Sequence, residues 1–325
     1  MKNNNSEKLL NEKYLPFTKE DFLKHFANVK GDKCSNSKEK HLKYYTSSID
    51  NYNKYLESEP KEKRLDKLRK PRQIEKDERF WTASSLMTLF YSADMVKEFT
   101  NLFSKAYGDK PPININSWED CFSGNRNKDI HLFFEANLPS PLLYKNWLQQ
   151  NIKERQFIPY ILNCAFDEIK KEFRGDMEGP TNVDAILINS KNGFSVIVEA
   201  KVLSDISISI TYDSMRNQLA RNIDVMLELN DNLCEPLNKR DPEKTLFLLI
   251  TPELFKKNPK SRLYGYKINE YKSSPNSLFK DLPHRKDIDN WMEIANRIGW
   301  LSWKEFKEVN QNCCLWLDDL NKSKR

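Results

Sequence analysis

The chain has 325 residues and lacks the long apolar runs that mark membrane and secreted proteins. No stretch approaches the roughly 18 consecutive apolar residues that a membrane span needs. The opening residues, Met1 to Asn5, contain no apolar core of the kind that a secretory signal carries. We therefore expect a cytoplasmic protein with no membrane partner.

Motifs of several common enzyme classes are missing as well. The six cysteines form no CxxC pair, which argues against a tetrahedral metal site and favours reduced thiols. The four histidines share no HxH, HExxH or HNH spacing, and neither GxxxxGKS/T nor GxGxxG occurs. Zinc catalysis and nucleotide hydrolysis therefore have no support in the sequence.

The composition is that of a folded, polar protein, with 38% apolar, 31% charged and 12% aromatic residues. It excludes wholesale disorder and collagen-like structure. The net charge of +6 permits nucleic acid as a partner without requiring one. The run 61–79 alone carries a net charge of +4, so it is either a solvated helix face or a strip that binds phosphates. In the second case the contacts are Lys67, Arg69, Lys70 and Arg72.

The chain is long enough for one large or two modest domains. Apolar spacings of three and four residues predict a helix over 42–56, a helical pair over 80–107 and a long helix over 147–173. We predict a mainly helical N-terminal lobe (1–145), an α/β core (146–255) and a small helical C-terminal lobe (256–325). The tryptophans of the last lobe are expected in its core rather than stacked on bases; they are Trp291, Trp300, Trp303 and Trp316.

The segment 179–202 predicts a β-hairpin, because two apolar runs flank the polar turn 190–193. Both runs are rich in Val, Ile and Leu without clean alternation, which is typical of strands covered on both faces. A helix is expected over 208–229. A further buried strand is expected over 244–251.

Three ionisable residues interrupt the hairpin strands: Asp184, Glu199 and Lys201. Burying them is costly unless they are compensated. If the turn is Lys191-Asn192, Asp184 lies opposite Glu199; if it is Asn192-Gly193, Asp184 lies opposite Lys201 and diagonal to Glu199. Either register places all three on one face, where two carboxylates can share a hard cation. A loop of odd length would separate them.

Asp184, followed by fourteen residues and then by Glu199-Ala200-Lys201, resembles the PD-(D/E)xK nuclease superfamily. Val183 stands where the family often has proline, and Pro180 lies four residues before the aspartate. The resemblance covers about 150–251. It implies an α/β fold with a restriction-endonuclease-like αβββαβ core, of which one strand is not evident in the sequence.

The resemblance also implies a site. Mg²⁺, with Mn²⁺ as a substitute, would be held by Asp184, Glu199 and the carbonyl of Ala200, while Lys201 would orient and help deprotonate the attacking water. A glutamate from the preceding helix would complete the site. The candidates are Glu154, which we prefer, Glu168 and Glu178. On the following helix Gln218 would order a water or contact a phosphate, and the nucleic-acid contacts would be Arg216 and Arg221.

The function implied by the resemblance is a metal-dependent endonuclease that cleaves DNA, in restriction or another anti-phage defence. DNA is favoured over RNA only because the superfamily favours it. A second copy of the chain or a defence protein would be its protein partner. The alternative is a non-catalytic module that binds DNA or protein on the same scaffold.

Overall fold

A computed structural model describes residues 8–27, 34–57, 71–175, 177–207, 212–229 and 233–318. Its centre is a five-stranded mixed sheet. In spatial order the strands are β3 (Ile130–Leu138), β6 (Thr181–Asn189), β7 (Ser195–Ala200), β8 (Thr245–Thr251) and β9 (Ile298–Ser302). The pairs β3–β6 and β6–β7 are antiparallel, whereas β7–β8 and β8–β9 are parallel.

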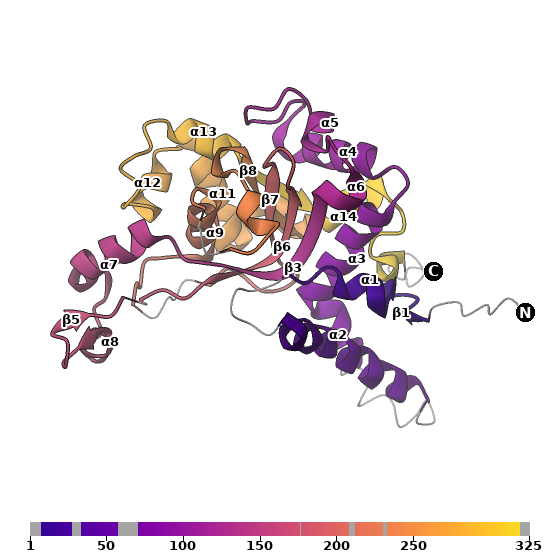
Figure 1. Cartoon of the computed structure of the whole chain (residues 1–325), viewed down its shortest axis with the longest axis horizontal. Helices are drawn as coiled ribbons and strands as arrows, with labels where there is room; N and C mark the ends of the chain where they lie inside the picture. The colour runs from indigo at the N-terminus through magenta and orange to yellow at the C-terminus, as the bar shows by residue number, and fades with distance from the viewer. Residues whose placement is uncertain are drawn as a thin grey trace, which may run out of the picture.

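Helices cover both faces of the sheet (Figure 1). The first face packs against α1 (Lys19–Leu23), α2 (Cys34–Glu57), α3 (Glu78–Tyr91), α4 (Met95–Tyr107) and α14 (Trp303–Val309). The second packs against α9 (Gln218–Met226), α11 (Leu263–Ser273), α12 (Ser277–Asp281) and α13 (Trp291–Asn296). Alternate strand residues point to opposite faces, so Val196 and Val198 join the first apolar cluster and Ile197 the second. The inner strands are thus buried on both sides, as their unbroken apolar runs predict.

Shorter elements complete the described residues. A hairpin of β1 (Leu9–Asn11) and β2 (Leu15–Thr18) precedes α1, while α5 (Trp118–Cys121) and α6 (Arg126–Asp129) precede β3, and α10 (Glu253–Lys257) follows β8. The 142–173 arm contains α7 (Leu142–Arg155), α8 (Pro159–Ala165), β4 (Phe166–Asp167) and β5 (Glu172–Phe173), and it projects away from the sheet (Figure 1). Within the described part of the chain, no helix is long and apolar enough to cross a membrane.

Several predicted elements are confirmed. The helix over 42–56 lies within α2, and the helical pair over 80–107 is formed by α3 and α4. The strand predicted over 244–251 is β8.

Two predicted helices have other bounds. The single helix over 147–173 is wrong: α7 ends at Arg155, and the proline that begins α8 holds the preceding residue, Ile158, in an extended conformation. Of the helix expected over 208–229, residues 208–211 lie outside the described residues, and α9 is shorter than the remainder of that range. It begins at Gln218, because the side chain of Asn217 caps it by accepting a hydrogen bond from the N–H of Ala220.

The sheet extends across both predicted domain boundaries. β3 comes from the segment predicted as the N-terminal lobe, and β9 comes from the segment predicted as the C-terminal lobe. Trp291, Trp303 and Trp316 are buried, as predicted, but Trp300 lies in β9 rather than in a helix. The C-terminal residues thus extend the central sheet, which the helical spacing of their apolar residues did not indicate.

Candidate active site

The predicted hairpin is formed by β6 and β7. The N–H of Asn189 donates to the carbonyl of Phe194 at 2.8 Å, so Phe194 pairs with the end of β6 and the turn itself is the four residues 190–193. Gly193 has a φ of +80°, in the left-handed region that favours glycine. A Cβ at this position would lie 2.7 Å from the Cβ of Asp241, so a larger residue would also clash. The turn therefore depends on this glycine, and its length sets the register of the two strands.

That register places Asp184 opposite Glu199. Ala185 pairs with Val198, so the next pair outward is Asp184 with Glu199, the first of the two predicted registers. Both side chains consequently lie on one face of the sheet. The N–H of Ala200 donates to Oδ2 of Asp184 at 2.7 Å, so a side-chain contact extends the hairpin beyond its last paired residues.

Glu199 is buried, and three side chains donate to its carboxylate. Oε1 accepts from Nζ of Lys201 at 2.5 Å and from Nε2 of Gln218 at 2.6 Å, and Oε2 accepts from Nδ2 of Asn222 at 2.8 Å. Gln218 and Asn222 are four residues apart on α9, so both point to the same side of the helix. Gln218 was predicted at the site. Asn222 was not, although the same four-residue spacing could have indicated it.

Lys201 follows directly on β7, and its backbone is held on both sides. Its N–H donates to the carbonyl of Ile250 at 2.8 Å. The next donor of a regular parallel ladder would be residue 252, but this is a proline without an N–H. The indole Nε1 of Trp303 donates to the carbonyl of Lys201 instead, at 3.0 Å. The first residue of α14 therefore fixes the end of the strand that carries the ExK residues.

A further carboxylate at the site is that of Glu78, the first residue of α3. Its Oε1 lies 3.8 Å from Nζ of Lys201, and its Oε2 accepts from Oγ of Ser204 at 2.9 Å. Sequence reasoning missed this residue, because an acidic residue in the first turn of a helix is common and lies here far upstream of the hairpin.

None of the three glutamates predicted to complete the site does so. Glu154 is exposed on α7, and Glu168 is exposed between β4 and β5, both in the 142–173 arm. Glu178 is buried and forms hydrogen bonds with Arg216 at 2.8 and 3.0 Å. In the described contacts, none of these carboxylates reaches Asp184 or Glu199.

A fourth carboxylate, that of Glu135, comes from β3. Glu135 lies across from Asp184, between the pairs Phe134–Ala185 and Ala136–Val183. Its φ is +52°, which is unusual for a residue other than glycine inside a strand. Its Oε1 lies 3.2 Å from Nε of Arg79 on α3. Sequence reasoning missed Glu135 together with the whole of β3.

The cluster carries an excess of negative charge. Burial, and then the charge of Glu199, raises the pKa of Asp184 well above its ordinary value. Burial also raises the pKa of Glu199, against the opposing effect of Lys201, and that of Glu135, against the effect of Arg79. Burial alone would lower the pKa of Lys201, but the charges of its carboxylate neighbours, Glu199 first, raise it overall. An added cation would relieve this imbalance.

The donor set fits Mg²⁺. Among the described residues, no group of three or more His, Cys, Asp or Glu side chains is arranged to hold a metal ion. Mg²⁺ does not need such a cage, because it keeps several waters and is commonly held by one or two carboxylates together with substrate phosphates. Asp184 and Glu199, on directly opposed residues, offer those carboxylates, and the carbonyl of Ala200 lies one residue further along β7.

The residues predicted to contact nucleic acid differ in their exposure and in their contacts. Arg216 cannot take that role as it stands, because its guanidinium is fully buried between Glu178 and Asp224. Arg221 is half-buried on α9, and it donates to the carbonyls of Gly179 and Pro180, both at 3.3 Å. Three of the residues in the basic strip lie outside the described residues, and the fourth lies in the 3-10 helix η1 (Pro71–Lys76); they are Lys67, Arg69, Lys70 and Arg72.

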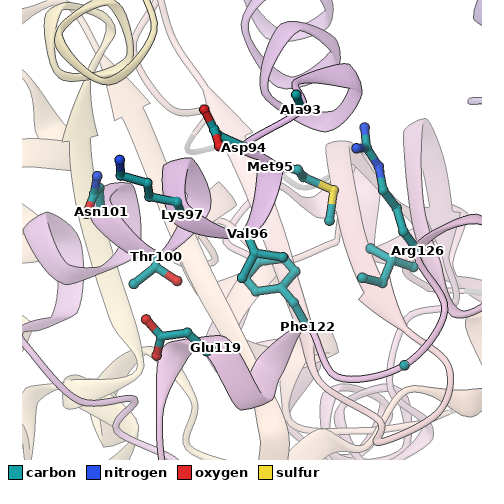
Figure 2. A pocket seen from close by; sticks show the side chains of 12 residues that line it. Ala93, Asp94, Met95, Val96, Lys97, Thr100, Asn101, Glu119, Phe122 and Arg126 are labelled. Carbon is teal, nitrogen blue, oxygen red and sulfur yellow. The ribbon is translucent and has the colours of Figure 1, made fainter.

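One cavity lies away from these carboxylates. It has a volume of about 470 Å³ and is lined by the start of α4, by α5 and by the residues before β3. Its charged residues include Lys97, Glu119 and Arg126, which lie around the ring of Phe122 (Figure 2). Ile130, the first residue of β3, also lines it, so the cavity lies towards the other end of that strand from Glu135.

Comparison with known proteins gives no family for this chain: no family model matches it, and no curated protein or solved structure is significantly similar to it.

Proposed function

We propose that this protein is a metal-dependent nuclease that hydrolyses phosphodiester bonds of DNA. The observation that carries the proposal is the convergence of Asp184, Glu199 and Lys201 on one hairpin, with Glu78 brought next to Lys201 from α3. Charged groups buried together in this way are costly to the fold, and such costs are concentrated at functional sites.

The order of elements supports the resemblance to the PD-(D/E)xK superfamily. Along the chain, α3 is followed by the helices α4, α5 and α6 and then by the antiparallel strands β3, β6 and β7; α9 comes next, and then β8, which is parallel to β7. If α4–α6 and the 142–173 arm are both taken as insertions, the remaining elements follow the αβββαβ order that we propose for a restriction-endonuclease-like core. In this proposal β3 would be the strand that the sequence did not reveal.

In this proposal each residue has a distinct role. Asp184, Glu199 and the carbonyl of Ala200 would hold Mg²⁺, which when bound neutralises phosphate charge and lowers the pKa of a coordinated water. Gln218 and Asn222 fix the orientation of the Glu199 carboxylate through their hydrogen bonds. Lys201 places a positive charge beside the carboxylates, where it can stabilise the charge that develops on the phosphate.

The test compares wild type with the double variant Glu199→Ala/Lys201→Ala. Each protein is incubated with supercoiled plasmid, linear DNA and RNA, in Mg²⁺, in Mn²⁺ and in EDTA. We expect metal-dependent cleavage of DNA by wild type and none by the variant. Cleavage that survives in the variant would refute the proposed site. If wild type shows neither cleavage nor any stabilisation by metal, the site is not catalytic and a binding module is the better description.

A matched pair of variants tests the third carboxylate. Glu78→Gln should reduce cleavage by roughly 10–100-fold, because it removes a charged neighbour that helps to position Lys201. Glu154→Gln, the same chemical change on the exposed side of α7, should leave the rate unchanged. The reverse result would restore Glu154 as the residue that completes the site.

Restriction or another anti-phage defence is the biological role we propose, and phage plating on cells carrying the Glu199→Ala/Lys201→Ala variant would test it.

A further inference from the structure

We propose that Arg79 binds a backbone phosphate of the nucleic acid at this site, and that Glu135 neutralises it until the strand arrives. The inference rests on the proposed function, since it deepens the account of the same site. It starts from a juxtaposition on α3, where the residue after Glu78 carries a guanidinium that meets a carboxylate of β3 at 3.2 Å.

Arg79 is the accessible cation of the cluster. Its side chain is 38% exposed, whereas that of Lys201 is 5% exposed and already donates to Glu199. Arg216 is fully buried, and Arg221 donates to two carbonyls of the segment before β6. A strand that approaches the carboxylates from solvent would therefore meet Arg79 before the other cations described around this site.

The guanidinium of Arg79 also retains its donors. Among the residues that the structure describes, it donates no hydrogen bond: it meets Glu135 as an ion pair and lies 4.0 Å above the ring of Tyr44. Stacking on an aromatic ring holds the guanidinium plane without using its N–H groups. A planar fork with free donors is the geometry that binds a phosphate through two parallel hydrogen bonds.

Glu135 is placed for this purpose at a conformational cost. A φ of +52° is unfavourable for a glutamate, and such strain persists where the surroundings enforce it, often at functional sites. The backbone of Glu135 is distorted at the point where the residue lies across from Asp184, and its side-chain carboxylate faces Arg79. A phosphate that enters would compete with this carboxylate for the guanidinium.

The experiment measures DNA binding in EDTA, where cleavage does not interfere. A fluorescein-labelled 20-base-pair duplex is titrated with each protein at several salt concentrations, and anisotropy gives Kd. We expect Arg79→Met to weaken binding about tenfold and to reduce the slope of log Kd against log salt by about one. Arg79→Lys keeps the charge but loses the planar fork, so its Kd should lie between those of wild type and Arg79→Met.

Glu135→Gln provides the opposite change. It removes the competing charge and keeps the size of the side chain, so we expect several-fold tighter binding through an unpaired Arg79. Arg174→Met is the matched control, because Arg174 is an exposed arginine directly after the 142–173 arm, and its replacement should leave Kd and the salt slope unchanged. Circular dichroism confirms that each variant is folded.

Equal binding by wild type and Arg79→Met, including no binding by either, would overturn the inference, and so would weaker binding by folded Glu135→Gln. The proposed nuclease fails by a different result. If wild type binds DNA through Arg79 but never cleaves it in Mg²⁺ or Mn²⁺, the phosphate contact stands and the catalytic proposal does not.

Discussion

Replacing Asp184 with asparagine should stabilise the metal-free protein while abolishing its response to metal. Carboxylates on directly opposed strand residues lie about 5 Å apart, and two unit charges at that distance repel by about 3 kcal/mol at an effective dielectric constant of 20. Lys201, which also lies close to Asp184, offsets part of this repulsion. The asparagine oxygen can still accept from the N–H of Ala200, so no hydrogen bond is lost. The net gain should be about 1–2 kcal/mol.

Thermal unfolding at pH 8 measures this effect in EDTA and again in Mg²⁺. In EDTA we expect the midpoint of Asp184→Asn to lie roughly 2–4 °C above that of wild type. Mg²⁺ at ten times its Kd should stabilise wild type by about 1.4 kcal/mol and leave the variant unchanged. The difference between the two unfolding midpoints should therefore shrink or change sign when Mg²⁺ is added.

Glu154→Gln is the control for this experiment, since it removes one negative charge from an exposed position in the 142–173 arm. It should behave as wild type in both buffers. The reasoning is refuted if Asp184→Asn is less stable than wild type in EDTA, because the carboxylate would then support the fold. It is equally refuted if the variant keeps the full response to Mg²⁺.

Two further predictions concern buried groups outside the site. Burial lowers the pKa of His25 from 6.5 to about 4. Between these pH values the unfolded chain binds a proton that the folded chain does not. The free energy of unfolding should therefore fall by up to about 3 kcal/mol as the pH drops from 6.5 to 4. Urea unfolding across this range should show the loss in wild type and a smaller loss in His25→Gln; equal losses would contradict the assignment. Arg216→Met leaves the carboxylates of Glu178 and Asp224 without their shared partner and should cost about 3–5 kcal/mol. A loss below 1 kcal/mol in urea unfolding would show that this network contributes little.

The hairpin was the part of the molecule most open to prediction. Its two apolar runs and the short turn between them limited the register to two choices, and both kept Asp184 with Glu199 and Lys201 on one face. The turn alone decided between them, through the left-handed conformation of Gly193. Local sequence could therefore predict these three residues as neighbours, because their proximity follows from strand pairing alone.

Residues joined by long-range packing could not be predicted in this way. Glu78 reaches the site only because α3 crosses the end of β7, and nothing in its local sequence distinguishes it from other acidic residues that begin helices. β3 contains His131, Glu135 and Asn137 among its apolar residues, so it did not resemble the all-apolar strands beside it. Arg216 lies in a polar stretch that suggested a solvent-facing surface. Its guanidinium is instead buried against Asp224 of the following helix α9 and Glu178, which lies 38 residues earlier in the chain.

The hydrogen bond from Trp303 to the carbonyl of Lys201 has a consequence for how the protein is made. The two residues are 102 positions apart, so at 5–20 residues per second the ribosome adds Trp303 about 5–20 s after Lys201. During that interval the strand end at Lys201 has no indole to bind, and β8 has no β9 beside it. A nascent chain would thus carry its acidic residues in an unfinished arrangement, and under the proposed function the chemistry would begin only after synthesis has passed this tryptophan.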